Sequence, residues 1–494
     1  MKGLWMLDPD FGQHLRTGEV IVKSGLPVTD PFSYTMPDWK YIDHAWLSDV
    51  LVWVGYQAGG TEFLAAVYAT MAIGALWLVT DKGRWGVVTA ILGAAVLIGR
   101  AGVRQQVEDW LLIAVILRLL EDAVWQKWKW VVPVIFGWWV NLHSGVAMGL
   151  AILGAGVTGK ILTNTLPPTS PSGPSPSISQ ARGFAAGEGS QAVKALFVGG
   201  LVVAAVLINP YGIRLWKEIG EVAGDRSLKT TIAEWLPWYG GVDLAFWMLA
   251  AMVGMWGWKY RRVMGWPERL IVGGTFVAGL SSLRHMPVFA LTAGWGLGKV
   301  WKAFEEDVGV NDEARRRLGG FYKLMVGVAV MVFVVQGGLE LWFSRSLSEA
   351  SFYPQKAVAW LKGQPDMGRL FSTYDWGGYL IWKLPEYKTF VDGRMPSWKC
   401  SMFNVQCLMP GYSAFEEFLD ITREGADFEP IFDKHGVEAV LWPKRDLVKT
   451  KVWINIELGK PGKKPKPLPV RLEAVGWKMV YEDGAALIFM RKGM

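Results

Sequence analysis

The sequence predicts an α-helical protein that crosses a membrane many times and ends in a soluble α/β domain. Three observations carry this prediction. Apolar side chains make up 51% of the 494 residues, and the mean hydropathy of +0.23 is high for a soluble enzyme. The chain also contains 29 tryptophans, and amphipathic rings of this kind collect at the headgroup depth of a bilayer.

About ten apolar segments are predicted to form the transmembrane helices. A straight span needs about 20 residues, and several of these segments are shorter, so we expect tilted, broken or extended helices. The segments are Glu62–Thr80, Trp85–Ile98, Trp110–Leu120, Val131–Leu142, Val146–Leu162, Ala195–Ile208, Leu244–Trp256, Leu270–Leu283, Pro287–Trp301 and Leu324–Trp342.

The segments outside the spans divide the chain further. After Trp342 the hydropathy falls, and helical stretches such as PQKAVAWL alternate with strand-like ones such as YKTFVDGR and VEAVLW. A hairpin is predicted in WKMVYEDGAALIFMRK, with its turn at Asp483-Gly484. The predicted parts are a first extracytoplasmic loop with an acidic motif (1–60), a first transmembrane half (61–162), a flexible Pro/Ser/Gly-rich linker (163–193), a second transmembrane half (194–343) and an extracytoplasmic α/β domain (344–494).

The basic residues indicate the orientation. The formal net charge is +7, but the lysines and arginines lie in short clusters between apolar runs, as in Lys259-Tyr-Arg-Arg262. This pattern is typical of cytoplasmic membrane loops and not of nucleic-acid binding. We therefore expect no nucleic-acid partner, and we place the first loop and the C-terminal domain outside. Cys400 and Cys407 then allow one disulfide there.

With this orientation, polar residues from distant parts of the chain fall on the outer side. Arginine offers a planar fork that fits phosphate oxygens, and an aspartate can take a proton from an attacking hydroxyl. Together with a second acid or a histidine, an aspartate can instead hold a divalent cation. The candidates are Asp8, Asp10, His14, His44, Arg104, Asn141, His143, Glu234, Arg284 and His285.

The same side chains have plainer interpretations. Asp8 and Asp10 also suit a solvated loop, or caps of a helix that begins near Phe11, where a carboxylate would accept free backbone N–H groups. Ordinary turn or membrane-interface positions remain an interpretation of Arg104, His143, Glu234, Arg284 and His285.

Several motifs resemble one family. LDPDFGQHLRTGEVIVKSGLPVTDPFSY and HAWLSDVLVWVGYQAGG look like the first extracytoplasmic loop of GT-C-type glycosyltransferases, which include protein mannosyltransferases and oligosaccharyltransferase catalytic subunits. A group of uncharacterised bacterial membrane proteins related to them is similar over nearly the whole chain. The motifs WWVNLHSG, NPYGIRLW, IAEWLPW, LSSLRHMPVFAL and YDWGGYLIWKLPEYKTFVDGR carry that wider similarity.

The resemblance implies transfer of a sugar from a polyprenyl-phosphate donor, with an acidic residue of the first loop acting on the acceptor. Matched to this sequence, that residue is Asp8 or Asp10, and we favour Asp10 because it lies one helical turn from His14. Arg104, Arg284 or both would meet the donor phosphate. Members of the superfamily differ in their need for a metal, so a divalent metal stays an open option. The family normally carries a transmembrane helix ahead of the loop, so we expect either an upstream start or insertion without that helix.

Two function classes follow. The first is a glycosyltransferase of the bacterial cytoplasmic membrane, with the bilayer, the lipid-linked donor and a glycan, lipid or protein acceptor as its partners. The second is a non-catalytic membrane protein that binds or moves a lipid-linked saccharide. In the C-terminal domain, Asp375, Asp392 and Arg394 either line a surface that touches the acceptor, or belong to turns in which Gly377-Gly378 and Asp392-Gly393 need unusual backbone angles.

Overall fold

The computed structural model describes residues 8–165, 194–225, 228–241, 243–309, 312–346, 352–398, 412–424, 426–447 and 466–492. Nearly all of the predicted linker, together with Cys400 and Cys407, lies outside these residues. The chain divides into two compact units. The helical unit contains Ala66–Ile219 and Ile232–Leu341, and the α/β unit contains Met1–Ala65, Gly220–Thr231 and Trp342–Met494.

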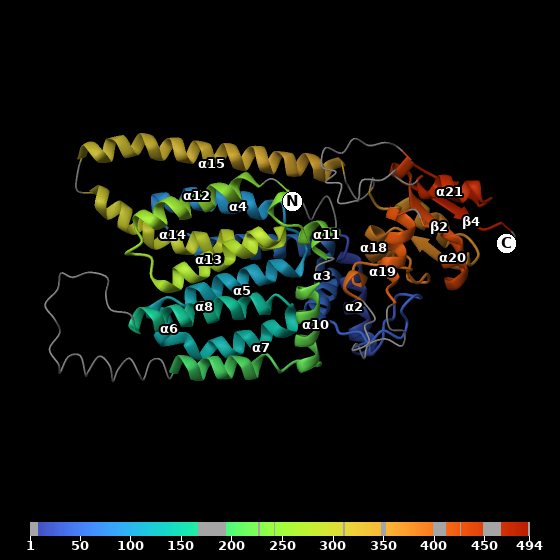
Figure 1. Ribbon diagram of the computed structural model, residues 1–494, viewed down its shortest axis with the longest axis horizontal. Coiled ribbons are helices and arrows are strands. Elements are labelled where there is room, and N and C mark those ends of the chain that lie inside the picture. Colours follow the sequence, from blue (N-terminus) through green and yellow to red (C-terminus); the bar gives the residue numbers. More distant parts are fainter. Residues whose placement is uncertain are drawn as a thin grey trace. The chain divides into compact units, whose positions relative to one another are not determined.

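The helical unit is a bundle of apolar helices (Figure 1). Within it, α13 packs against α8 and α14, and α14 packs against α4. Its helices are the second part of α3 (Trp46–Val79), α4 (Arg84–Ile98), α5 (Gln105–Leu119), α6 (Asp122–Trp128), η1 (Lys129–Val131), α7 (Val132–Leu142), α8 (Val146–Thr165), Lys194–Ala205, the first part of α10 (Ile213–Gly224), η2 (Ala233–Trp235), η3 (Trp238–Gly240), α12 (Leu244–Lys259), α13 (Trp266–Ser281), η4 (Leu283–His285), α14 (Met286–Gly309) and α15 (Asp312–Ser346). Every predicted span overlaps one of these helices, and α3, α14 and α15 extend well beyond the predicted ends.

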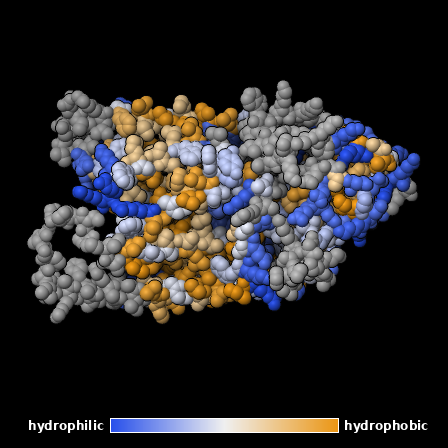
Figure 2. All heavy atoms as spheres, in the orientation of Figure 1, coloured by the Kyte–Doolittle hydropathy of each residue, from blue (hydrophilic) through white to orange (hydrophobic). Residues whose placement is uncertain are grey.

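Apolar side chains cover this unit from outside as well as inside. Trp77 is 63% exposed and Val334 is 60% exposed, and Figure 2 shows hydrophobic residues over the helices on the face in view. By length and composition, three helices among the described residues are able to cross a membrane: Trp46–Val79, Val146–Thr163 and Gly319–Trp342. The protein is therefore an integral membrane protein.

Helix α3 begins earlier than predicted and contains a bend. HAWLSDVLVWVGYQAGG, expected to belong to the first loop, is helical from Trp46 onward, and the helix breaks at Gly59 and Gly60 before it continues to Val79. Gly60 has φ 67° and ψ −161°, a conformation that only glycine adopts without strain. The two adjacent glycines therefore mark the bend.

The α/β unit is built around a four-stranded mixed sheet in the order β1-β2-β4-β3. Strand β2 pairs with β1 in parallel and with β4 in antiparallel fashion, and β3 and β4 form the predicted hairpin. The strands are β1 (Arg369–Ser372), β2 (Val437–Pro443), β3 (Lys478–Glu482) and β4 (Ala486–Met490). The helices are α2 (Phe11–Ser24), the first part of α3, the end of α10, α11 (Leu228–Thr231), α17 (Gln355–Lys362), η5 (Tyr374–Trp376), α18 (Gly377–Lys383), η6 (Met395–Ser397), α19 (Ala414–Leu419), η7 (Asp420–Glu424), α20 (Glu429–His435), η8 (Lys444–Leu447) and α21 (Leu468–Ala474).

One strand prediction is wrong. YKTFVDGR forms bends and turns, and only Thr389 makes a bridge, in parallel with Ser33 of the first loop. The backbone N–H of Thr389 donates to the carbonyl of Phe32 at 2.9 Å, and its carbonyl accepts from the backbone N–H of Tyr34 at 3.2 Å. The backbone groups that a sheet strand would use are therefore already bonded to the first loop.

Candidate functional site

The acidic motif of the first loop forms the beginning of α2. Asp8 precedes the helix, and its Oδ1 accepts a hydrogen bond from the backbone N–H of Asp10 at 3.0 Å. Asp10 stands at the N-cap position, but its side chain accepts no capping hydrogen bond. Capping by the Asp10 carboxylate, the plainer interpretation of this residue, is therefore wrong.

Glycines bring the C-terminal segments of the α/β unit against this motif. A Cβ atom added at Gly393 would overlap the Asp10 carboxylate, and one added at Gly378 would overlap the carbonyl oxygen of Pro9. A Cβ on Gly12 of α2 would in turn overlap the carbonyl of Gly378. Asp10 therefore lies directly against the FVDGR segment, and only glycine permits that approach.

These contacts correct the interpretation of the glycines. Gly377, Gly378 and Gly393 are not among the glycines with positive φ, so unusual backbone angles do not explain them. The Cβ of Asp392 lies where a side chain on Gly377 would be. Close packing of α18, α2 and the FVDGR segment is the physical reason for glycine at these positions.

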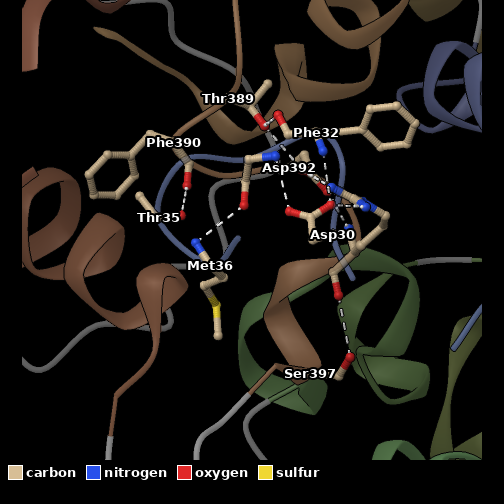
Figure 3. Close-up of polar contacts among 10 residues, drawn as sticks. Asp30, Phe32, Thr35, Met36, Thr389, Phe390, Asp392 and Ser397 are labelled. Carbon is tan, nitrogen blue, oxygen red and sulfur yellow. Dashed lines mark hydrogen bonds and ion pairs between the residues drawn. The ribbon is translucent and has the colours of Figure 1, made fainter. Parts of the chain in front are cut away.

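A buried ion cluster attaches the first loop to FVDGR (Figure 3). Arg394 donates to Asp392 through Nε and Nη2, each at 2.7 Å, and to Asp30 through Nη1 at 2.6 Å. The Asp30 carboxylate also accepts the backbone N–H groups of Phe32 and Ser33. Burial would lower the pKa of Arg394, but the two carboxylates hold it well above its usual value.

Asp392 and Arg394 therefore do not line a surface for an acceptor. Both carboxylates of the cluster are 0% exposed and the arginine side chain is 5% exposed. Asp375 is different, because its side chain is 46% exposed and pairs with Arg445 at 3.6 Å. The sequence-based surface prediction is wrong for two of its three residues.

His14 lies on α2 beside two further carboxyl groups, those of Asp49 and Asp43. Its Nδ1 is 2.7 Å from Oδ1 of Asp49, which lies in the first turn of α3. Asp43 is adjacent: burial raises its pKa well above the usual range, and the nearby Asp49 carboxylate raises it further. His44, the neighbouring residue in sequence, is exposed.

In the helical unit, Glu234 lies between two arginines. Arg104 donates through Nη2 to Oε1 of Glu234, and the Arg284 guanidinium stacks 4.6 Å from the centre of the Trp235 ring. Burial would raise the pKa of Glu234, but Arg104 and Arg284 together hold it below its usual value. Arg104 is thus paired with Glu234, and Arg284 lies close enough to act on the same carboxylate.

The structure places the other predicted residues of the helical unit as follows. Asn141 donates to the carbonyls of Gly137 and Ile208 at 2.8 and 2.9 Å. His143 is 6% exposed, and its Nδ1 lies 2.5 Å from Oδ2 of Asp109. His285 belongs to the short helix η4, next to Arg284.

The ten predicted residues thus fall into two sets. Asp8, Asp10, His14 and His44 belong to the α/β unit, and the other six belong to the helical unit. That both sets face one side of the membrane stays a prediction. In the described parts of the chain, no group of three or more His, Cys, Asp or Glu is arranged to hold a metal ion, so no metal ligands are assigned.

Sequence reasoning missed several buried acids. The Asp109 carboxylate accepts a hydrogen bond from the indole Nε1 of Trp139 at 2.7 Å, and its other oxygen is hydrogen-bonded to His143. Asp49 holds His14 in a similar way. The available signal was an aspartate inside or beside an apolar helix, as in HAWLSDVLVW, because such a charge is retained in an apolar environment only when it has a partner.

Comparisons with known proteins give the fold family. No protein-family model matches the chain, and no curated protein matches it. The structure is similar to the oligosaccharyltransferase of Archaeoglobus fulgidus in its apo form, with a TM-score of 0.51, 13% identity, and coverage of 90% of this chain and 67% of that chain. It also matches apo ArnT from Cupriavidus metallidurans, with a TM-score of 0.47, 13% identity, and coverage of 98% and 94%. At 13% identity the similarity to the oligosaccharyltransferase shows the fold alone: the chain shares the fold of that protein, the GT-C type expected from the sequence.

Proposed function

We propose that the protein is a glycosyltransferase that moves a sugar from a polyprenyl-phosphate donor to an acceptor hydroxyl at the extracytoplasmic face of the membrane. The observation that carries the proposal is the position of Asp10, a partly buried carboxylate at the start of α2 that lies against the FVDGR segment. The fold shared with an oligosaccharyltransferase supports the reaction class.

In this proposal Asp10 is the general base. The acceptor oxygen forms a bond to the anomeric carbon, the bond from that carbon to the phosphate oxygen breaks, and the hydroxyl proton passes to Asp10. The polyprenyl phosphate leaves with the bonding electron pair. Asp10 is favoured over Asp8 because it lies one helical turn from His14, whose backbone N–H donates to the Asp10 carbonyl at 3.1 Å.

Arg104 and Arg284 are proposed to hold the phosphate of the donor. Both guanidinium groups act on the Glu234 carboxylate, and positive charge of this kind suits a group that gains negative charge as the glycosidic bond breaks. The proposed substrate contacts of the remaining predicted residues stay as stated from the sequence: His14, His44, Asn141, His143, Glu234 and His285.

The proposal is tested by release of polyprenyl phosphate. Protein in lipid nanodiscs is given ³²P-labelled polyprenyl-phosphate mannose, glucose or N-acetylglucosamine, and labelled polyprenyl phosphate is separated by thin-layer chromatography. We expect Asp10→Asn to lower release by about 10² to 10⁴-fold, the usual contribution of a general base. Asp38→Asn, an exposed aspartate of the same loop, is the matched control and should release label as the wild type does.

Two results would overturn the proposal. Full activity of both Asp8→Asn and Asp10→Asn removes the proposed base. Binding of every donor without release, with substitutions that change donor affinity only, favours instead a protein that binds or moves a lipid-linked saccharide. Arg104→Gln and Arg284→Gln should weaken donor binding if they hold the phosphate.

A further inference from the structure

Three side chains of the α/β unit form a chain that leads from the protein interior to a partly exposed imidazole. Asp43 is 4% exposed, and the side chains of Asp49 and His14 are 1% and 18% exposed. They come from three separate places: the segment before α3, the first turn of α3, and α2. This order of burial makes His14 the outer end of the chain.

At the buried end of the chain, the hydrogen bonds of the Asp43 carboxyl group are best satisfied when that group is protonated and neutral. Its Oδ1 accepts the backbone N–H of Ala45 at 3.0 Å, while its Oδ2 is buried and meets no donor among the described residues. The neighbouring group is the Asp49 carboxylate, and burial followed by this second acid raises the pKa of Asp43. Two buried carboxyl groups this close cannot both ionise at low cost. A proton on Oδ2 of Asp43 satisfies both carboxyl groups, because Asp43 then donates a hydrogen bond and Asp49 accepts it.

The state of Asp49 then fixes the tautomer of His14. An ionised Asp49 can only accept hydrogen bonds, so the proton of a neutral His14 must lie on Nδ1, which is 2.7 Å from Asp49. The other ring nitrogen, Nε2, is then an acceptor. Among the described residues Nε2 has no hydrogen-bond partner, and it lies at the ring edge away from the buried carboxylate.

We propose that the Asp43–Asp49–His14 chain presents the Nε2 atom of His14 as a hydrogen-bond acceptor for a substrate hydroxyl, and that it disfavours anionic groups at this position. Asp43 and Asp49 are positioning residues in this arrangement. Arg394, a cation that acts on the nearby Tyr41, is engaged by Asp30 and Asp392. The phenol of Tyr41 is kept neutral because burial, and then Asp43, raise its pKa. The substrate class rests on the proposed function: a neutral hydroxyl of the sugar or of the acceptor.

The protonation pattern is tested without any substrate. The chain has five histidines, so ¹⁵N-histidine NMR of the protein in bilayers is tractable, and His14→Gln identifies the His14 signals. We expect neutral His14 to be the Nδ1–H tautomer. Asp43→Asn should keep this tautomer, because the asparagine carbonyl still accepts the Ala45 N–H and its NH₂ still donates to Asp49. Asp43→Val, similar in size but without a donor, should shift the population toward Nε2–H.

The opposite results overturn the inference. An Nε2–H tautomer in the wild type would mean that Nε2 of His14 donates a hydrogen bond and does not accept one. The wild-type spectrum alone is enough to detect this tautomer. If Asp43→Asn disturbs His14 as much as Asp43→Val does, Asp43 is ionised in the native protein. Both readouts are independent of catalysis, so a protein that releases no polyprenyl phosphate leaves them valid.

The hydroxyl-binding role is tested by kinetics in the release assay. His14→Phe keeps a planar ring but removes the acceptor. We expect the KM for the labelled sugar donor to rise about 2- to 10-fold, the range of one neutral hydrogen bond, and kcat to change less. Asp43→Val should move KM in the same direction, and Asp43→Asn should restore most of the loss. An unchanged KM in His14→Phe would overturn the role, while the NMR result would still report the tautomer.

Discussion

Arg394 is the residue whose loss we expect to damage the α/β unit most. Its guanidinium is bonded to Asp30 and Asp392, and both carboxylates are 0% exposed. Arg394→Met would leave two buried negative charges without a counter-ion. Removal of one partner from a buried ion pair costs about 3–5 kcal/mol, which is a large part of the roughly 5–15 kcal/mol that holds a domain folded.

Amide hydrogen exchange measures this cost where it arises. The amides of Phe32 and Ser33 are bonded to the Asp30 carboxylate, and that of Thr389 to the carbonyl of Phe32. Because each 1.4 kcal/mol is a factor of ten, a loss of that size should speed their exchange by roughly 10² to 10⁴-fold in Arg394→Met.

Arg445→Met provides the control for this measurement. Its ion pair with Asp375 is long, at 3.6 Å, and both side chains are at least 40% exposed. Exposed pairs of this kind contribute about 0–1 kcal/mol, so exchange near Thr389 should change by less than about tenfold. Equal exchange rates in the Arg394 and Arg445 variants would refute the view that the buried cluster holds the first loop in place.

Three further predictions concern other parts of the molecule. Gly393→Ala places a methyl group on the Asp10 carboxylate, so we expect a loss of about 1–3 kcal/mol in thermal melting and a lower release of polyprenyl phosphate. Burial alone would raise the pKa of Glu234, but its two arginine partners lower it. The ionised Glu234 carboxylate therefore stabilises the fold above its unfolded pKa of about 4.3, and this contribution is lost as the pH falls through the lowered folded pKa. Amide hydrogen exchange in η2, measured over a series of pH values, checks this loss. Trp139→Phe removes the indole donor to the buried Asp109 and should cost about 1–3 kcal/mol, measured as a fall in melting temperature.

The membrane helices could be predicted from the sequence because each depends on a local property, a continuous run of apolar side chains. The hairpin at Asp483 was equally local: its carboxylate accepts the backbone N–H groups of Ala485 and Ala486. The strand prediction for YKTFVDGR was wrong because the structure of this segment depends on a distant part of the chain. Its β-branched and aromatic residues favour a strand, but the backbone of Thr389 is bonded to Phe32 and Tyr34, more than 350 residues earlier in the chain.

The candidate site was predictable only in part, for the same physical reason. Asp8, Asp10 and His14 share one short motif, so their proximity follows from helix geometry. The role of His14 depends on Asp49, 35 residues away. The glycines of α18 and FVDGR looked like turn residues because a close approach between distant segments leaves no mark in the local sequence.

The ion cluster of the first loop also has a consequence for biosynthesis. Asp30 leaves the ribosome 364 residues before Arg394, and at about 5–20 residues per second this separation lasts roughly 20 to 70 s. During that time the Asp30 carboxylate has no arginine to balance it and must stay in contact with water. The first loop is therefore among the last parts of the chain to reach its final structure, and a nascent chain that stops before Arg394 cannot complete it.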